Sequence, residues 1–293
     1  MNPAKYSISD LEKLTGVKAP TIRIWEKRYH IIQPERTDTN IRFYSAHDLR
    51  RLMNITFLNK HGFRISAISN MTDNEIEDVV ARLTQQPGAD DGFLSDLVQS
   101  AIDLDEDRFD KIINASILKL GFENAFITIV FPLLEKVNIL WQINKLSACQ
   151  ERFASNLVRH KLVVAIDGLF GHSASEPLEY LLYLPSGRYD EISLLYASYL
   201  VRKQGHHVIY LGPSIPLDHL RSLNNREKIN RVVTNLSNGF TDKELLQYTL
   251  QVQKVFPSQK LFLICSSPEV LSDYQGDIQI LPTFKAIQEA FTG

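Results

Sequence analysis

Apolar residues near the start of the chain recur at helical spacing between clear turn signals. Ser7 or Ser9 can cap a first helix, and Gly16 permits the sharp turn that follows it. Pro20 suits the first turn of a second helix that ends near residue 29. Two helices joined by so short a turn containing glycine are typical of a helix-turn-helix motif.

A hairpin and a third helix follow this motif. Residues 34–44 alternate polar and apolar positions around a polar turn, as a short β-hairpin does. Ser45 can cap a helix whose apolar side faces inward until Gly62 ends it. One more helical patch covers residues 65–85. The pattern predicts a domain of helices with one hairpin over residues 1–75.

Beyond this domain the apolar pattern stays helical as far as residue 170. A linker rich in Gly, Asp and Gln spans residues 85–92. The helical stretch after it predicts a four-helix domain over residues 90–172. Its breaks fall near residues 103–105, 121 and 144–145.

After residue 177 short apolar runs alternate with amphipathic segments. This alternation predicts a five-stranded parallel sheet wound by helices, in a domain over residues 177–293. Ligands of such sheets bind at the carboxyl ends of the strands. The expected strands are residues 178–184, 207–211, 231–235, 261–265 and 278–281, and the expected helices lie near residues 190–204, 216–223, 241–255 and 283–291. The fold class is therefore multidomain, with α domains followed by an α/β domain.

The composition is that of a folded protein, which we expect in the cytoplasm. Of 293 residues, 44% are hydrophobic and 23% charged, as in ordinary globular proteins. No window approaches 18 uninterrupted apolar residues, and the N-terminus has no apolar signal core, so we expect neither a membrane partner nor export. Cys149 and Cys265 lie far apart, which argues against a disulfide framework or a structural zinc site.

The net charge of −2 hides an asymmetry along the chain. Residues 1–64 carry twelve Lys and Arg against six Asp and Glu, a net charge of +6. The other 20 basic and 28 acidic residues give residues 65–293 a net charge of −8. A basic head on an acidic body predicts a polyanionic partner for the head alone.

The second helix combines two kinds of side chain. Its polar and basic residues, which we expect to be exposed, are Thr21, Arg23, Lys27 and Arg28. Its apolar residues, of the kind that a helix buries, are Ile22, Ile24 and Trp25. The hairpin adds Arg36, Asn40, Arg42 and Tyr44, and we expect its cations and aromatic ring to project beside the helix. A helix fits the major groove, and flanking cations can bind phosphates. The alternative is a helical domain whose charges are merely solvated.

These segments resemble the winged helix-turn-helix of MerR-type transcription regulators. The likeness covers about residues 4–70 and rests on Tyr6-Ser7-Ile8, Thr15-Gly16-Val17, Thr21-Ile22-Arg23-Ile24-Trp25-Glu26 and Arg36-Thr37-Asp38-Thr39-Asn40-Ile41-Arg42-Phe43-Tyr44-Ser45. In that family the second helix reads DNA and an Arg-x-Tyr wing contacts the DNA backbone. The resemblance implies a double-stranded DNA operator as partner and a dimer or higher oligomer. It assigns DNA contacts to Thr21, Arg23, Lys27, Arg28, Tyr29, Arg36, Arg42 and Tyr44.

The body, about residues 90–293, resembles the cobalamin-binding unit of light- and B12-responsive MerR-type repressors. That unit is a four-helix cap followed by a flavodoxin-like (Rossmann-like) five-stranded parallel sheet. The likeness rests on residues 140–147, 151–157 and 205–216. The cap of the family has a Trp, then nine residues, then Glu-His. This chain has Trp141 and Glu151 at that spacing, but Arg152 replaces the histidine.

The sheet domain departs from the family at two more places. The pattern acidic-x-His-x-x-Gly, whose histidine coordinates cobalt, falls on Arg188, Asp190 and Ser193. A carboxylate is a hard oxygen ligand and a poor substitute for imidazole on cobalt. Paired glycines after the fourth strand, which let the nucleotide tail approach the backbone, fall on Ser266 and Ser267.

These departures argue against histidine-ligated cobalamin, so we expect no bound cofactor and no metal. A weaker mode, in which cobalamin keeps its own base, stays open because it needs no protein ligand. Without a cofactor, the body is expected to self-associate, to dock a protein antagonist or to bind another ligand. The residues expected to line a cleft between cap and sheet, where ion pairs could hold it shut, are Trp141, Glu151, Arg152, Arg188 and Asp190.

The sequence thus predicts a MerR-type DNA-binding transcription regulator rather than an enzyme. It has no Gly-x-Ser-x-Gly elbow, no P-loop and no dinucleotide glycine fingerprint. The alternative is a cobalamin-binding, light-responsive repressor that uses a base-on or other non-standard mode.

Overall fold

The computed structural model of the chain contains two compact units, Met1–Ala154 and Ser155–Gly293. It describes residues 6–36, 42–83, 91–143, 145–169, 173–223, 228–237, 240–266, 268–271, 274 and 276–292. The predicted boundaries of three domains, at residues 75–90 and 172–177, remain a prediction.

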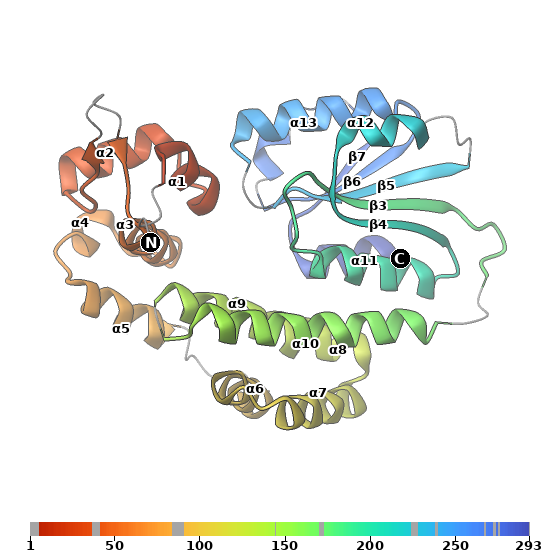
Figure 1. Cartoon of the computed structure of the whole chain (residues 1–293), viewed down its shortest axis with the longest axis horizontal. Coiled ribbons are helices and arrows are strands. Elements are labelled where there is room, and N and C mark those ends of the chain that lie inside the picture. The colour runs from red at the N-terminus through yellow and green to blue at the C-terminus, as the bar shows by residue number, and fades with distance from the viewer. Residues whose placement is uncertain are drawn as a thin grey trace. The chain divides into compact units, whose positions relative to one another are not determined.

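The first unit begins with a winged helix-turn-helix (Figure 1). Its elements are α1 (Ile8–Thr15), α2 (Ala19–Tyr29), β1 (Glu35–Arg36), β2 (Arg42–Phe43), α3 (Ala46–Lys60), α4 (Ile65–Ile68) and α5 (Asp73–Leu83). Ser7 and Ser45 cap α1 and α3 in capping boxes, and Gly16 ends α1 in the left-handed conformation (φ 72°). The predicted helices and hairpin strands are confirmed, while the predicted hairpin turn at residues 37–40 lies outside the described residues.

The single helical patch predicted over residues 65–85 is two helices, α4 and α5. A cap separates them. The backbone N–H and the hydroxyl of Thr72 donate to the Glu75 carboxylate at 2.7 and 2.9 Å, and Glu75 N–H donates back to the Thr72 hydroxyl at 3.3 Å. Such a reciprocal pair starts a new helix.

Four helical runs follow, as predicted. They are α6 (Asp91–Asp103), α7 (Glu106–Leu120), a run from α8 (Phe122–Ala125) through a π-helical turn (Phe126–Val130) to α9 (Phe131–Gln142), and α10 (Ala148–Asp167). Leu104 and Gly121 separate the first three runs, with φ of 55° and 79°. Side chains at the end of the third run, Ile139, Leu140 and Ile143, belong to the apolar core of the winged helix-turn-helix.

One run among the described residues, Phe122–Gln142, is long and apolar enough to cross a membrane by length and composition, with a mean hydropathy of 1.3. A core helix of a soluble protein passes the same test.

The second unit is a parallel five-stranded sheet with helices on both faces, as predicted. The strands are β3 (Glu179–Pro185), β4 (His207–Ile215), β5 (Ile229–Asn235), β6 (Lys260–Ile264) and β7 (Ile278–Leu281). The helices are α11 (Ile192–Lys203), α12 (Leu217–Leu220), α13 (Asp242–Val255) and α14 (Phe284–Thr292). The strand order β4-β3-β5-β6-β7 is that of a flavodoxin-like sheet.

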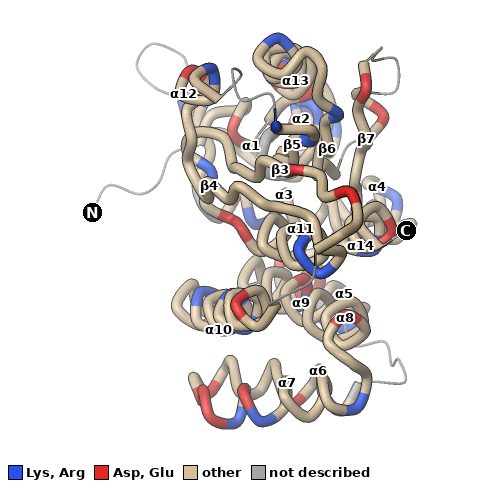
Figure 2. The backbone as a smooth tube through the Cα atoms, turned by 90° about the vertical axis from the view of Figure 1, so that its right-hand side faces the viewer, with Lys and Arg blue, Asp and Glu red and all other residues tan. Residues whose placement is uncertain are grey.

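The helices of this unit form two layers around the sheet. Helices α12 and α13 cover one face, and α11 and α14 cover the other (Figures 1 and 2). Leu181 and Leu263 are fully buried in the core that α13 covers. Tyr180 and Phe262, one residue away along their strands, contact the ring of Phe291 in α14. Because all five strands are parallel, they end at one carboxyl edge of the sheet, where a ligand site is expected.

Candidate DNA-binding surface and candidate ligand site

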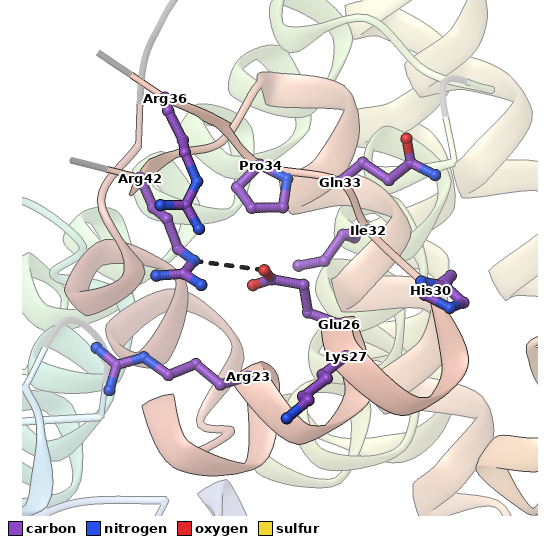
Figure 3. Close-up of a pocket in the computed structure, with 9 residues that line it drawn as sticks. All are labelled: Arg23, Glu26, Lys27, His30, Ile32, Gln33, Pro34, Arg36 and Arg42. Atoms are coloured by element: carbon purple, nitrogen blue, oxygen red, sulfur yellow. Dashed lines mark hydrogen bonds and ion pairs between the residues drawn. The ribbon is translucent and has the colours of Figure 1, made fainter. Parts of the chain in front are cut away.

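A pocket of about 530 Å³ lies between helix α2 and the hairpin wing (Figure 3). Four basic side chains and one carboxylate are among the residues that line it. The lining residues are Arg23, Glu26, Lys27, His30, Ile32, Gln33, Pro34, Arg36 and Arg42. The excess of cations makes this pocket a candidate for binding phosphate groups.

Glu26 fixes the position of one of these cations. Its carboxylate accepts hydrogen bonds from Arg42 Nε and from the Tyr44 hydroxyl, both at 3.3 Å. The Glu26 side chain is 17% exposed and that of Arg42 is 36% exposed. The half-buried carboxylate therefore holds Arg42 in place while part of the Arg42 guanidinium stays accessible to a ligand.

The structure distributes the predicted DNA-contacting residues over three levels of exposure. Arg23, Lys27, Arg28 and Arg36 are exposed. Thr21, Tyr29 and Arg42 are half-buried, and the guanidinium of Arg28 lies 5.4 Å from the centre of the Tyr29 ring. The prediction that the Tyr44 ring projects beside the helix is wrong, because this side chain is fully buried. Tyr44 reaches Glu26 instead, so its place is beneath the surface.

A second prediction for α2 is also wrong. Ile24 was expected to be buried with Ile22, but it is 56% exposed while Ile22 is 0% exposed. Trp25 is half-buried and packs against the apolar core. Ile22 and Ile24 are two positions apart and therefore about 200° apart around the helix, so the two side chains cannot both face the core.

The buried Tyr44 hydroxyl predicts a pH-dependent stability. Burial, the charge of Glu26 and their hydrogen bond raise the pKa of Tyr44 from 10 to about 12. Between these pH values the unfolded chain loses a proton that the folded chain keeps, so stability falls as pH rises, by about 2–3 kcal/mol in total. We expect the stability advantage of wild type over Tyr44→Phe, from urea unfolding at pH 9 to 12, to shrink by this amount. A stability difference between wild type and Tyr44→Phe that stays constant over this pH range would contradict the assignment.

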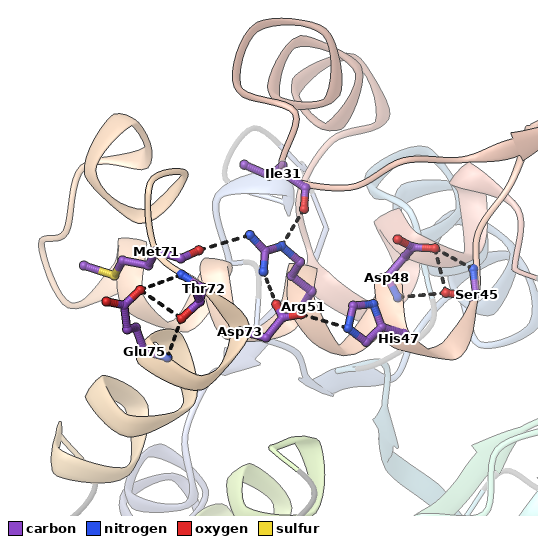
Figure 4. A network of polar contacts seen from close by, with 9 residues as sticks. All are labelled: Ile31, Ser45, His47, Asp48, Arg51, Met71, Thr72, Asp73 and Glu75. Atoms are coloured by element: carbon purple, nitrogen blue, oxygen red, sulfur yellow. Dashed lines mark hydrogen bonds and ion pairs between the residues drawn. The ribbon is translucent and has the colours of Figure 1, made fainter.

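An arginine joins the end of α2 to the start of α5 (Figure 4). Arg51 donates through Nε to the Ile31 carbonyl at 2.7 Å and through Nη2 to the Met71 carbonyl at 3.4 Å. Its Nη1 binds the Asp73 carboxylate, which also contacts His47 Nε2 at 3.0 Å. Three segments of the first unit are thus tied together next to α2.

The carboxyl edge of the sheet in the second unit holds a carboxylate that the sequence analysis did not single out. Glu191, directly before α11, is 8% exposed. Its two oxygens accept hydrogen bonds from Arg159 Nε of α10 at 2.5 Å and from the Tyr210 hydroxyl of β4 at 2.7 Å. Burial and the bond to Glu191 raise the pKa of Tyr210 well above its usual value, so this phenol stays a donor. Arg159 and Tyr210 lie 32 and 19 residues from Glu191 along the chain, so no local sequence pattern predicts these two contacts.

The predicted residues of the sheet domain lie around this carboxylate in different environments. Ser193 is buried, and its hydroxyl accepts a hydrogen bond from the Asn235 amide at 2.7 Å. Asp190 is exposed, and the Arg188 guanidinium lies 4.7 Å from the centre of the Phe240 ring. The Ser266 hydroxyl donates to the Ser237 carbonyl at 3.0 Å, which joins the loops after β5 and β6. Ser267 lies outside the described residues.

The predicted cap residues belong to the other unit. Trp141 is 41% exposed, and Arg152 lies 3.8 Å from the carboxylate of its neighbour Glu151. A cleft lined jointly by these residues and the sheet domain stays a prediction. Within the described part of the chain, no three His, Cys, Asp or Glu side chains are grouped to hold a metal ion.

Two segments of the chain match known protein families. Residues 6–75 match the MerR HTH family regulatory proteins, and residues 94–165 match the B12 binding domain. The first match covers the winged helix-turn-helix, and the second covers the helices from α6 into α10.

Similar proteins include two transcriptional repressors. The chain is 26% identical to the HTH-type transcriptional repressor CarH of Myxococcus xanthus, over 73% of this chain and 73% of CarH. It is 24% identical to the HTH-type transcriptional repressor CarA of Myxococcus xanthus, over 71% of this chain and 68% of CarA. A solved monomethylamine corrinoid protein of Methanosarcina barkeri shares the fold, with a TM-score of 0.55 at 12% identity over 70% of this chain and 99% of that protein. The chain is thus a DNA-binding transcription regulator of the MerR type that carries a B12-binding domain and is homologous to CarH and CarA.

Proposed function

We propose that the chain binds a double-stranded DNA operator through α2 and the wing, as a dimer or higher oligomer. The observation that carries this proposal is the pocket between these elements, which four basic side chains and one half-buried carboxylate line. A dimer fits because each chain offers one recognition helix, and paired helices read the two halves of a palindromic operator.

Each basic residue has a role in this proposal. Arg23, Lys27 and Arg28, with Thr21 and Tyr29, lie on α2 and contact base edges or phosphates in the major groove. Arg36 and Arg42 on the wing bind phosphates beside the groove. Tyr44 and Glu26 make no DNA contact and position Arg42 from beneath.

The test is a salt titration of the full-length protein on duplexes selected from a random pool. Binding through several phosphates makes the logarithm of the affinity fall linearly with the logarithm of the salt concentration. Selection of a common, palindromic sequence with a steep salt dependence is the expected result. A protein that enriches no duplex at low salt would overturn the proposal.

For the body, we propose that the B12-binding domain serves oligomerisation, docking of a protein antagonist or sensing, without histidine-ligated cobalamin. The donor set at the carboxyl edge does not fit that cofactor. Asp190 supplies an exposed carboxylate where the family has its imidazole, and the adjacent Glu191 is already engaged by Arg159 and Tyr210. The Ser266–Ser237 hydrogen bond joins the two loops at the expected slot for the nucleotide tail.

Cobalamin uptake is therefore expected to fail. We expect full-length protein incubated in the dark with adenosylcobalamin or methylcobalamin, and then desalted, to show no visible absorption band of the cofactor. Retained colour at a near-equal molar ratio would contradict this and favour a second candidate, a cobalamin-binding repressor that leaves the cofactor its own base. The match of residues 94–165 to the B12 binding domain is the observation that supports this second candidate.

We further infer that the chain acts in the cytoplasm and catalyses no reaction. Its relatives CarH and CarA are transcriptional repressors, and access to an operator requires the compartment that holds the DNA. The corrinoid-protein fold by itself supports no reaction, because a fold hosts many functions.

A further inference from the structure

Among the described residues of the winged helix-turn-helix, the most exposed large apolar side chain is Ile24, in the middle of the helix that faces DNA in the proposed function. Ile24 is 56% exposed, whereas Ile22, two positions earlier, is 0% exposed. Residues two positions apart on an α-helix point in directions about 200° apart, so Ile24 points away from the core that holds Ile22. It occupies the centre of the outer face of α2.

The neighbours of Ile24 on that face are polar or basic. Residues three and four positions apart are adjacent on a helix surface, which places Thr21, Lys27 and Arg28 around it. Lys27 and Arg28 are exposed and Thr21 is half-buried. A branched apolar side chain is therefore framed by two cations and a hydroxyl.

This combination selects among partners. An apolar protein surface would have to desolvate two cations to cover Ile24, which costs free energy unless each is paired. The major groove of double-stranded DNA offers phosphates for the cations and, at each thymine, a C5-methyl group beside hydrogen-bond acceptors. The major groove therefore offers a partner both for the two cations and for the apolar Ile24 side chain.

We infer that Ile24 is a specificity-determining residue that packs against a thymine C5-methyl group in the operator. This inference rests on the proposed DNA binding and adds to it the base that the apolar part of α2 prefers. Arg23, Lys27 and Arg28 supply the polar contacts around it.

The experiment removes the Ile24 side chain and the thymine methyl group, first separately and then together. Full-length wild type and Ile24→Ala are measured on the duplex that wild type selects from a random pool, with each thymine in turn replaced by deoxyuridine. Deoxyuridine lacks only the methyl group. For wild type, one position is expected to lose about three- to fivefold in affinity, the value of one buried methyl. Ile24→Ala is expected to lose less than about 1.5-fold there.

Alanine is a good helix former and Ile24 is exposed, so Ile24→Ala keeps the fold. The matched control is Leu118→Ala, which shortens an 88% exposed apolar residue of α7 and should retain the full deoxyuridine effect. Equal losses in wild type and Ile24→Ala, or no sensitive position in wild type, would overturn the inference. Either result leaves DNA binding intact, whereas failure to select any duplex would defeat the proposed function itself.

Discussion

Replacement of Arg42 by alanine is expected to weaken binding to every duplex by about ten- to a hundredfold, whatever its sequence. The change has two additive consequences. It removes a cation from the pocket, and it removes the partner that neutralises the Glu26 carboxylate, which lines the same pocket and would then repel phosphates. A hydrogen bond to a charged group contributes about 1.5–3 kcal/mol, and loss of one phosphate contact lowers the salt slope by about 0.9.

Fluorescence anisotropy over a series of salt concentrations measures both quantities. The matched control is Arg221→Ala, an exposed arginine of the second unit that pairs with Asp218 at 3.1 Å and should leave both unchanged. Arg23→Ala provides the contrast on α2, because loss of a base contact relaxes sequence preference more than it weakens binding overall. An Arg42→Ala protein with the wild-type affinity and salt slope would refute the phosphate role of the wing.

Replacement of Arg51 by alanine is expected to destabilise the first unit by about 2–4 kcal/mol. The Arg51 side chain is 17% exposed and binds Asp73 together with the carbonyls of Ile31 and Met71. Its loss leaves these two carbonyls without the partner they have in the fold. Both tryptophans of the chain, Trp25 and Trp141, belong to this unit, so their fluorescence during urea unfolding reports on it alone.

The control for Arg51→Ala is Arg64→Ala, an exposed arginine of the same unit, which should change stability by less than about 0.5 kcal/mol. Equal unfolding midpoints for Arg51→Ala and Arg64→Ala would show that the three-way contact contributes nothing. A loss of stability confined to Arg51→Ala would identify this contact as the tie between α2 and α5.

Much of the fold follows from local patterns in the sequence. Strand and helix positions in the second unit agree with the apolar periodicity, because each element is long enough to carry its own pattern. The wrong predictions concern side chains whose exposure depends on tertiary packing. Ile24 and Ile22 are the same residue type two positions apart, and the direction of the core separates them. The position of Tyr44 in the hairpin suggests an exposed side chain. Its backbone instead forms a β-bridge with Tyr6, and its hydroxyl donates to the Glu26 carboxylate.

The candidate ligand site was harder to predict than the DNA-binding surface. Basic residues on one helix and one hairpin are close in sequence, so their common face can be found by spacing alone. Glu191 lies between Asp190 and Ser193, and no position of the cobalt-binding pattern falls on it. Its partners Arg159 and Tyr210 come from a different helix and a different strand, and only the folded sheet brings them together.

The polar groups around Glu191 satisfy one another, and this has a consequence for how the second unit responds to a ligand. A ligand that binds the folded state stabilises it by an amount set by its own affinity and concentration. A ligand that displaced Arg159 or Tyr210 from Glu191 would lose the stabilisation of those contacts before it gained its own. The ligands that raise the melting temperature of this unit most are therefore those that leave the three side chains together.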